Sequence, residues 1–236
     1  MQYNQCHKCV MDRSAEEITF SAGGVCNFCT QAQKALREIQ FEKPNLDKWI
    51  KKIKEDGKGK KYDAILGLSG GVDSSTTLHY AVQQGLRLLT FSMDNGYQDP
   101  RADTNVLLMV EKLKVPFHRY VLDLDKFRDL QSAYLKAGVK NVEAIYDNLL
   151  AGASYEMANQ YKIKWILSGG NVASESVMPV LWSFRSGDLV NIKSIYKWAT
   201  GKNLKRSENF PLFGIARFNY YKWWCGIRIF YLLDYL

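Results

Sequence analysis

The feature that most constrains the fold is a junction at which a short apolar run meets two glycines and three serines. Residues 62–68 read as a buried strand, the heptapeptide SGGVDSS occupies 69–75, and residues 73–84 read as a helix. Gly70 and Gly71 let the backbone turn tightly and approach a ligand without a side-chain clash. The helix offers unpaired N–H groups and the positive end of its dipole. The junction therefore predicts a cradle for a phosphate or a pyrophosphate group.

Two familiar nucleotide-binding loops do not fit this junction. The sequence has no G-x-x-x-x-G-K-[ST], and no G-x-G-x-x-G follows the strand; the pattern present is S-G-G-x-D-S. A plainer alternative is a helix that begins with a serine cap after a glycine turn, although a cap requires one serine and no pair of glycines. Within the cradle, Asp73 would repel a bare phosphate, so it is better suited to meet Mg2+.

Segments that read as strands alternate with segments that read as helices after residue 61. The expected strands lie at 62–68, 86–93, 117–122 and 164–168, and the expected helices at 73–84, 101–114, 124–137 and 143–162. This order predicts an α/β fold, a doubly wound parallel sheet covered on both faces. Two more helices are expected before the sheet, at 29–40 and 45–56.

The segments that follow the expected strands are rich in small or acidic residues. They occupy 69–75, 94–98, 123–125 and 169–175, with the sequences SGGVDSS, DNGYQ, DLD and GGNVASE. Ligands of doubly wound sheets bind beyond the carboxyl ends of the strands, where the strand order reverses. The coincidence of these four segments predicts one binding site at that edge.

Four of the five cysteines form two C-x2-C pairs near the N-terminus. Cys6 and Cys9 are separated from Cys26 and Cys29 by sixteen residues. Four thiolates satisfy tetrahedral Zn2+, and a closed four-thiolate site supports folding and leaves no open position for catalysis. Disulfides are the weaker explanation because the first twenty residues show no secretory signal. The spacing predicts a structural zinc ribbon, and chance clustering is the alternative.

Composition narrows the remaining function classes. The chain has 236 residues, 47% of them hydrophobic, and a formal net charge of +8. No apolar run is long enough to span a membrane, so a cytoplasmic protein is expected. Residues 43–61 carry a quarter of the Lys and Arg residues. These cations suit a solvated helix, an anionic small substrate or nucleic acid, and charge alone does not choose between these readings.

The S-G-G-x-D-S loop resembles the pyrophosphate loop of the PP-loop ATP pyrophosphatase superfamily, which splits ATP into AMP and pyrophosphate. The resemblance covers about residues 62–176 and implies an adenine-nucleotide alpha hydrolase-like sheet. It implies that the backbone at 70–74 and the side chains of Ser69 and Ser74 hold the leaving pyrophosphate. The adenosine is then expected near the end of the second strand, at residues 92–95.

A finer resemblance extends over about residues 6–212. The stretch CHKCVMDRSAEEITFSAGGVCNFC is similar to the zinc motif of the N-acetyl sugar amidotransferases of lipopolysaccharide and surface-glycan biosynthesis, O-antigen included. The segments SMDNGY, FRDLQ, LSGGN with the following SE, and MPVLW fall in that family's order. This resemblance implies that ATP adenylates the acetamido oxygen of a nucleotide-linked N-acetyl sugar. Ammonia then displaces AMP to give an acetamidino sugar.

The two resemblances together assign the candidate site residues. Those expected to bind the nucleotide are Ser69, Gly70, Gly71, Asp73, Ser74, Ser75, Ser92, Asp94, Asn95 and Gly170. Those expected to act in catalysis are Asp73, Ser74, Asn171 and Glu175. Asp94 fits a strand-end helix cap equally well, and a polar loop without a ligand is the alternative for 171–175. Asp147 resembles an acidic position of the family, and a place on a solvated helix face is the alternative.

The resemblance also implies partners and a domain order. A glutaminase needs a Cys–His arrangement, and after the four paired cysteines only Cys225 remains. Ammonia is therefore expected from a separate glutaminase, like the glutaminase and cyclase pair of imidazole glycerol phosphate synthase. The expected order is a zinc ribbon at 1–32, a basic helical connector at 33–61, the PP-loop domain at 62–212 and an aromatic segment at 213–236. Since members of the family are longer, this last segment is expected to begin a further region that is cut short.

Two other functions remain open. One is a tRNA-modifying PP-loop enzyme, a thiolase or a lysidine-type synthetase, which the positive charge would suit. The other is a nucleotide-binding module without catalytic activity, whose ribbon docks a partner protein. Binding of tRNA would favour the first, and nucleotide binding without turnover would favour the second.

Overall fold

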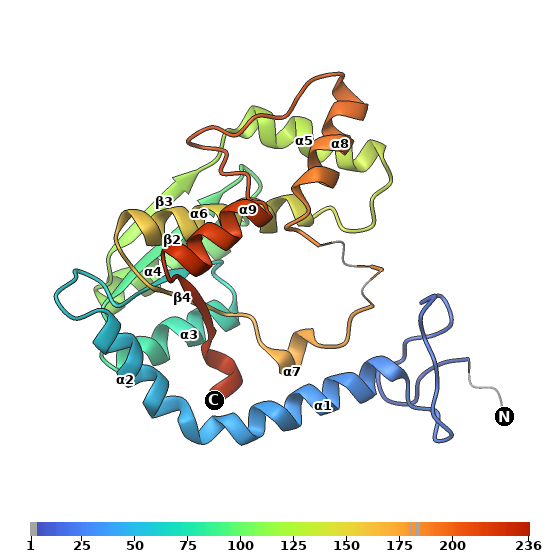
Figure 1. Ribbon diagram of the computed structural model, residues 1–236, viewed down its shortest axis with the longest axis horizontal. Coiled ribbons are helices and arrows are strands. Elements are labelled where there is room, and N and C mark those ends of the chain that lie inside the picture. Colours follow the sequence, from blue (N-terminus) through green and yellow to red (C-terminus); the bar gives the residue numbers. More distant parts are fainter. Residues whose placement is uncertain (1–3, 180, 183–184) are drawn as a thin grey trace.

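A parallel sheet of five strands forms the centre of the molecule (Figure 1). The computed structural model describes residues 4–179, 181–182 and 185–236. The strands are β1 (Ala64–Gly67), β2 (Leu88–Asp94), β3 (Phe117–Val121), β4 (Trp165–Ser168) and β5 (Arg228–Tyr231), and their spatial order is β3-β2-β1-β4-β5. Every neighbouring pair is parallel. The predicted α/β class and parallel sheet are confirmed.

Nine α-helices connect or flank these strands in the described part of the chain. They are α1 (Asn27–Glu42), α2 (Leu46–Asp56), α3 (Val72–Gln83), α4 (Pro100–Leu113), α5 (Leu124–Lys136), α6 (Ala144–Gln160), α7 (Val172–Glu175), α8 (Leu189–Thr200) and α9 (Ile215–Asn219). Among the described residues, none of these helices combines the length and the apolar character that crossing a membrane requires.

Alternate residues of the central strands β1, β2 and β4 point to two separate cores, one on each face of the sheet. Ile65 of β1 packs with α5, α6 and α8 on one face. Ala64 and Leu66 pack with α2, α3 and α4 on the other. Successive side chains of a strand alternate between faces, so a strand buried on both sides reads as a continuous apolar run. The apolar run at 62–68 was recognisable as a strand for this reason.

The strand order reverses between β1 and β4. The chain passes from β1 to β2 and then β3 on one side, and returns to place β4 against the opposite edge of β1. Residues 65–66 of β1 pair with residues 166–167 of β4. The loops that follow these two strands therefore leave the sheet side by side, which is where doubly wound folds bind ligands.

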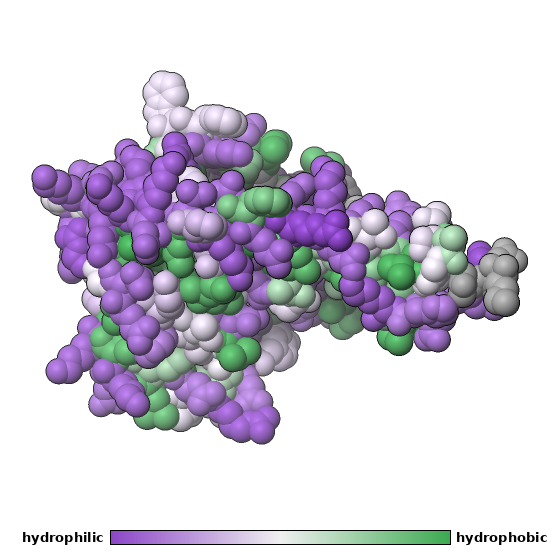
Figure 2. All heavy atoms as spheres, turned by 90° about the horizontal axis from the view of Figure 1, so that it is seen from below, coloured by the Kyte–Doolittle hydropathy of each residue, from purple (hydrophilic) through white to green (hydrophobic). Residues whose placement is uncertain are grey.

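The N-terminal cysteine segment lies at one end of the molecule, and α1 runs from it along the sheet domain (Figure 1). Figure 2, turned to the underside, shows the same region as a narrow lobe projecting from a broad body. The lobe has its own small core around Ala15 and Phe28, to which Val177 and Trp182 from the segment after α7 contribute. Val180, within the MPVLW motif, and residues 1–3 lie outside the described residues.

The central sheet extends beyond residue 212. β5 lies within the segment 213–236, which was expected to follow the sheet domain, and it pairs with β4 as the edge strand. The run of residues 228–231 is short and stands inside a longer aromatic stretch without glycine or proline on its C-terminal side. Its strand character therefore depends on the partner strand and was not visible in the sequence.

Candidate functional site

The loop after β1 passes very close to the first turn of α4. Gly70 has a φ of +77°, and a Cβ built on it would lie 2.3 Å from the carbonyl oxygen of Ala102. Only glycine combines this left-handed conformation with so short a backbone approach. Gly71 is the N-cap of α3, and because it has no side chain, the first N–H groups of this helix remain available for an anion.

Serine hydroxyl groups fix the shape of this loop. The Oγ atoms of Ser69 and Ser74 lie 3.1 Å apart, and the N–H of Gly71 donates to Ser69 Oγ at 3.3 Å. Ser75 donates its hydroxyl proton to the carbonyl of Gly71 at 2.6 Å. Ser69 and Asp73 are exposed while Ser74 is buried. The loop is thus held in shape before a ligand arrives, and the hydroxyl proton of Ser75 is already in use.

The loop after β4 rests directly on the start of α3. A Cβ built on Gly169 would lie 3.0 Å from the backbone nitrogen of Ser74 and 3.2 Å from the carbonyl carbon of Asp73. A Cβ on Gly170 would lie 3.1 Å from Oε2 of Glu175. Two segments about 100 residues apart in the chain therefore meet at one point. Gly170 and Glu175 belong to the same part of the surface as Asp73 and Ser74.

The two predicted catalytic residues of the second loop differ in their surroundings. Asn171 is the N-cap of α7, and its Oδ1 accepts hydrogen bonds from the N–H of Ser174 at 2.9 Å and from its hydroxyl at 3.0 Å. Glu175 is exposed, and its pKa is raised by desolvation and by the negative charges of Asp73 and Asp234. Asn171 thus has a structural task already, and the raised pKa makes Glu175 a stronger proton acceptor than an ordinary glutamate.

Carboxylates from several elements converge around Glu175. Desolvation and then the charges of Glu143 and Glu175 raise the pKa of Asp147, at the start of α6. Asp73 lies at the first turn of α3 and Asp234 in the turn Leu232–Tyr235. Mutual repulsion of this kind is relieved by a bound cation, and oxygen ligands are the type that Mg2+ prefers. The Mg2+ that ATP brings with it would relieve this repulsion, although among the described residues only the four paired cysteines stand close enough together to form a metal site by themselves.

The end of β2 carries the residues expected near the nucleotide. Ser92 is buried, and its hydroxyl lies 3.4 Å from the amide nitrogen of Gln98. Asp94 accepts a hydrogen bond from the N–H of Gly96 at 2.9 Å, and Asn95 accepts one from Tyr97 at 3.0 Å. The side chains of Asp94 and Asn95 shape the turn after the strand, and their contact with a nucleotide stays a prediction.

Three residues at this edge of the sheet were not predicted from the sequence. Arg119 of β3 donates to Asp103 at 2.9 Å and has a guanidinium nitrogen 3.8 Å from Asp94. A charged residue inside a strand-like run was the available signal for it. The other two are Tyr231 and Asp234, which reach the β4–α7 loop from the C-terminal segment. Nothing in the sequence placed that segment beside β4.

The four paired cysteines form one compact centre. Their Sγ atoms all lie within 4.8 Å of one another. Cys6 and Cys29 are 4.0 Å apart and Cys9 and Cys26 are 3.6 Å apart, sulfur to sulfur. Thiolates at tetrahedral corners around one Zn2+, each about 2.3 Å from the ion, are about 3.8 Å apart. The arrangement fits a single ion, because the thiolates of a four-iron cluster each bind a different iron and stand farther apart.

Backbone N–H groups add to the fit of this centre for a metal. The N–H groups of Lys8 and Cys26 donate to Cys6 Sγ at 3.4 and 3.3 Å. Burial raises the pKa of Cys6, but hydrogen bonds from the backbone of Cys26, Cys9 and Lys8 outweigh it and lower that pKa to about 6. Burial raises the pKa of Cys29 instead. A cation would stabilise all four sulfurs as thiolates.

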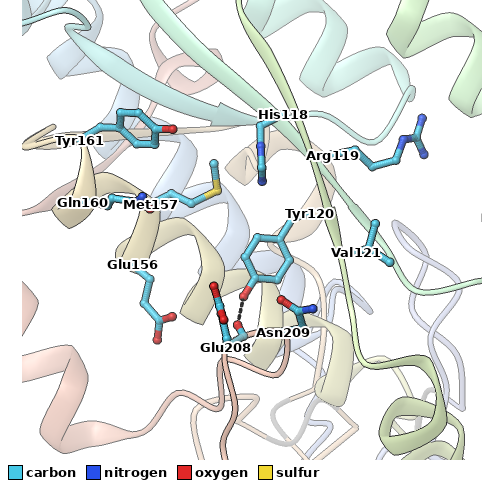
Figure 3. Close-up of a pocket in the computed structure, with 10 residues that line it drawn as sticks. All are labelled: His118, Arg119, Tyr120, Val121, Glu156, Met157, Gln160, Tyr161, Glu208 and Asn209. Atoms are coloured by element: carbon cyan, nitrogen blue, oxygen red, sulfur yellow. Dashed lines mark hydrogen bonds between the residues drawn. The ribbon is translucent and has the colours of Figure 1, made fainter.

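A separate pocket of about 450 Å3 lies against β3 and the C-terminal half of α6 (Figure 3). Tyr120 donates its hydroxyl proton to the carbonyl of Glu208 at 2.5 Å across this pocket. Burial raises the pKa of Tyr120 to about 12. The lining includes none of the residues predicted for nucleotide or sugar. The pocket lies along the edge strand β3, away from the loops after β1 and β4.

One family model matches the part of the chain that contains the loop after β1. Residues 63–161 match the family model of the queuosine biosynthesis protein QueC. This match covers the pyrophosphate loop and supports an ATP-dependent enzyme of the PP-loop ATP pyrophosphatase superfamily. The matched region ends before the β4–α7 loop and begins after the cysteine centre. No protein with curated annotation matches the chain.

Solved structures with a similar arrangement include three synthetases. The glutamine-dependent NAD+ synthetase of Acinetobacter baumannii, in complex with ADP, is 20% identical, with a TM-score of 0.42 over 65% of this chain and 31% of that one. The NH3-dependent NAD synthetase of Campylobacter jejuni subsp. jejuni NCTC 11168, with a nitrate ion, is 14% identical, with a TM-score of 0.41 over 69% and 72%. The NMN synthetase of Francisella tularensis is 13% identical, with a TM-score of 0.38 over 81% and 92%. This chain spans about a third of the length of the first of these enzymes.

Proposed function

We propose that this protein is an ATP-dependent amidotransferase that converts the acetamido group of a nucleotide-linked N-acetyl sugar into an acetamidino group. The observation that carries the proposal is the meeting of the loops after β1 and β4, in which Gly169 lies on the backbone of Asp73 and Ser74. One loop offers the free N–H groups of a helix start and the other offers Glu175. An activating nucleotide and a second substrate would thus meet at the strand-order reversal.

The proposed reaction begins at the helix start. The N–H groups at 70–74 hold the β- and γ-phosphates of ATP, which leaves the α-phosphorus open to the acetamido oxygen. The bond from that oxygen to the α-phosphorus forms as the bond to the β-phosphate oxygen breaks and pyrophosphate leaves. Preorganised N–H donors stabilise the charge that develops on the leaving group. Asp73 would hold Mg2+, which supplies further positive charge at the phosphates.

The second step replaces oxygen by nitrogen. Ammonia attacks the activated carbon, the bond from carbon to the AMP oxygen breaks, and the amidine forms with loss of one ammonia proton. Glu175 would accept this proton, because desolvation and the charge of Asp73 raise its pKa from that of an ordinary glutamate. Asn171 keeps α7 in place through its cap. No covalent bond to the enzyme is needed.

The proposal also covers two features outside this site, the cysteine centre and the source of ammonia. The cysteine centre binds one structural Zn2+ through Cys6, Cys9, Cys26 and Cys29, whose sulfurs surround a single point. Ammonia comes from a separate glutaminase with a cyclase-like partner. The one cysteine outside the centre, Cys225, is half-buried beside the apolar core of α6 and α9.

The test is product analysis by mass spectrometry. The chain is incubated with ATP, Mg2+, ammonium and each of a panel of UDP-linked N-acetyl sugars. The proposal expects AMP, pyrophosphate and a sugar lighter by about one mass unit, in which oxygen is replaced by NH. Asp73→Asn should suppress both products, whereas Asp47→Asn, which changes an exposed acid in the first turn of α2, serves as the matched control. Pyrophosphate release that is indifferent to every acetamido sugar would refute the assignment of the substrate.

A second candidate is favoured by the match at residues 63–161, which is to a protein of queuosine biosynthesis. The same loop would then activate a nucleobase or its precursor, in keeping with the net charge of +8. A parallel incubation with tRNA and with modified nucleobase precursors distinguishes the two. ATP turnover that requires such a substrate, and not an acetamido sugar, would replace the first proposal by this one.

A further inference from the structure

The C-terminal turn places a carboxylate on the short helix that carries Glu175. Asp234 Oδ1 accepts a hydrogen bond of 2.8 Å from the N–H of Val172, the first residue of α7. The side chain of Asn171 accepts a hydrogen bond from a second N–H of the same turn, that of Ser174. Two donors that a helix start leaves without an intrahelical partner are thus satisfied by side chains. One of the two acceptors comes from 62 residues further along the chain.

The position of Asp234 is fixed by the strand before it and by the buried residues beside it. It belongs to the turn Leu232–Tyr235, which follows β5 directly, and β5 pairs with β4 along its whole length. Leu232 is fully buried, and the ring centroid of Tyr235 lies 5.0 Å from that of Phe230. The sheet therefore fixes Asp234 relative to β4, independently of the loop that leads from β4 to α7.

The loop that leads from β4 to α7 lies beside the loop after β1. A Cβ built on Gly170 would lie 3.1 Å from Oε2 of Glu175, and one built on the neighbouring Gly169 would lie 3.0 Å from the backbone nitrogen of Ser74, so neither position has room for a side chain. Tyr231 of β5 also approaches Gly170, with its ring carbon 3.4 Å from the position of a Cβ there. The loop from Gly169 to Glu175 is thus enclosed between the start of α3 and the C-terminal segment.

We propose that Asp234 is a positioning residue, which fixes α7 and so sets Glu175 against the start of α3. The catalytic consequence of this inference rests on the proposed function, while the positional claim stands on the structure alone. Asp234 acts through the N–H of Val172 and touches neither nucleotide nor sugar. The C-terminal segment 228–235 thereby becomes part of the site that the loops after β1 and β4 form.

The positional claim is tested by hydrogen exchange on the full chain. Asp234→Ala removes the acceptor, whereas Asp234→Asn keeps an oxygen at the same position. The matched control is Asp188→Ala, which removes the cap that accepts from Asn191 at 3.0 Å at the start of α8. Asp234→Ala should speed amide exchange at residues 172–175 about tenfold, the effect of a typical lost cap. Asp188→Ala should act only on α8, and Asp234→Asn should retain the protection at 172–175.

The catalytic consequence is tested with the same variants in sugar-dependent pyrophosphate release. Asp234→Ala should lower kcat about tenfold or more and leave the KM for ATP within about twofold, because the loop after β1 is untouched. Asp234→Asn should restore most of kcat. Unchanged exchange at 172–175 in Asp234→Ala would overturn the positional claim, and equal kcat in the Ala and Asn variants would overturn its consequence. A wild-type chain that turns over no acetamido sugar would instead refute the proposed function, and the exchange result would still decide the position of α7.

Discussion

Replacement of Gly70 by alanine tests how the pyrophosphate loop is built. The Cβ of Gly70→Ala would lie 2.3 Å from the carbonyl oxygen and 2.7 Å from the carbonyl carbon of Ala102. Both are backbone atoms of the first turn of α4, so no flexible side chain can move aside. The residue also has a φ of +77°, which an L side chain adopts at a cost of about 1–2 kcal/mol. Forcing the loop and α4 apart adds about 1–3 kcal/mol.

The chain offers a matched control that separates these two costs. Gly59 has the same φ of +77°, but a Cβ built there meets no heavy atom within 4 Å. Gly59→Ala should therefore show only the conformational cost of about 1–2 kcal/mol. The free energy of unfolding of each variant is measured with urea. The two values should differ by about 1–3 kcal/mol, which is the cost of the contact with Ala102.

Activity should separate the two variants more strongly than stability. A loop displaced by about 1 Å misplaces the phosphates, and such a displacement costs about 100-fold in rate. Gly70→Ala should lose ATP-dependent pyrophosphate release to this extent, while Gly59→Ala keeps the wild-type rate at temperatures where it is folded. Equal stability and equal activity of the two variants would refute the close approach of the loop to α4.

Three further predictions concern the acidic residues and the cysteine centre. Asp73→Asn should reduce the rate of pyrophosphate release about 100-fold at saturating ATP and Mg2+, and Asp47→Asn should leave it unchanged. A steady-state assay over a range of Mg2+ concentrations checks this. Cys26→Ser should lower Tm and the zinc content measured by elemental analysis, whereas Cys225→Ser should leave about one Zn2+ per chain. The raised pKa of Glu175 means that the folded chain binds its proton more tightly than the unfolded chain does. In magnesium-free buffer Glu175→Gln should therefore gain stability over wild type as the pH rises through that pKa, and the gain should vanish below the ordinary range of a glutamate; urea titrations at several pH values measure it.

The sheet and its two glycine loops were predictable from the sequence because each depends on local signals. The run from Ala64 to Leu68 is apolar because both faces of β1 are buried. The helix α3 begins after a glycine pair, as the turn requires. The sixteen-residue spacing of the cysteine pairs predicted one compact centre, and their sulfurs do converge. Patterns of this kind are set by neighbouring residues in the chain.

The parts that were not predictable depend on contacts between distant segments. β5 is a strand because β4 offers an edge to residues 228–231, and Asp234 reaches α7 only through that pairing. Arg119 was read as part of a strand, and its contact with Asp103 of α4 depends on how β3 lies against β2. Ser75 was expected to face phosphate, but its hydroxyl donates to the carbonyl of Gly71, the N-cap of α3. Such competition from a nearby backbone acceptor is common for serine at a helix start.

The most direct test of the account is the position of a bound nucleotide in a crystal of the chain with Mg2+ and α,β-methylene ATP, which cannot release pyrophosphate. The account predicts that oxygens of the β- and γ-phosphates lie about 2.7–3.2 Å from the N–H groups at the start of α3, next to Gly70 and Gly71. A nucleotide whose phosphates bind elsewhere, with nothing on the loop between β1 and α3, would contradict it.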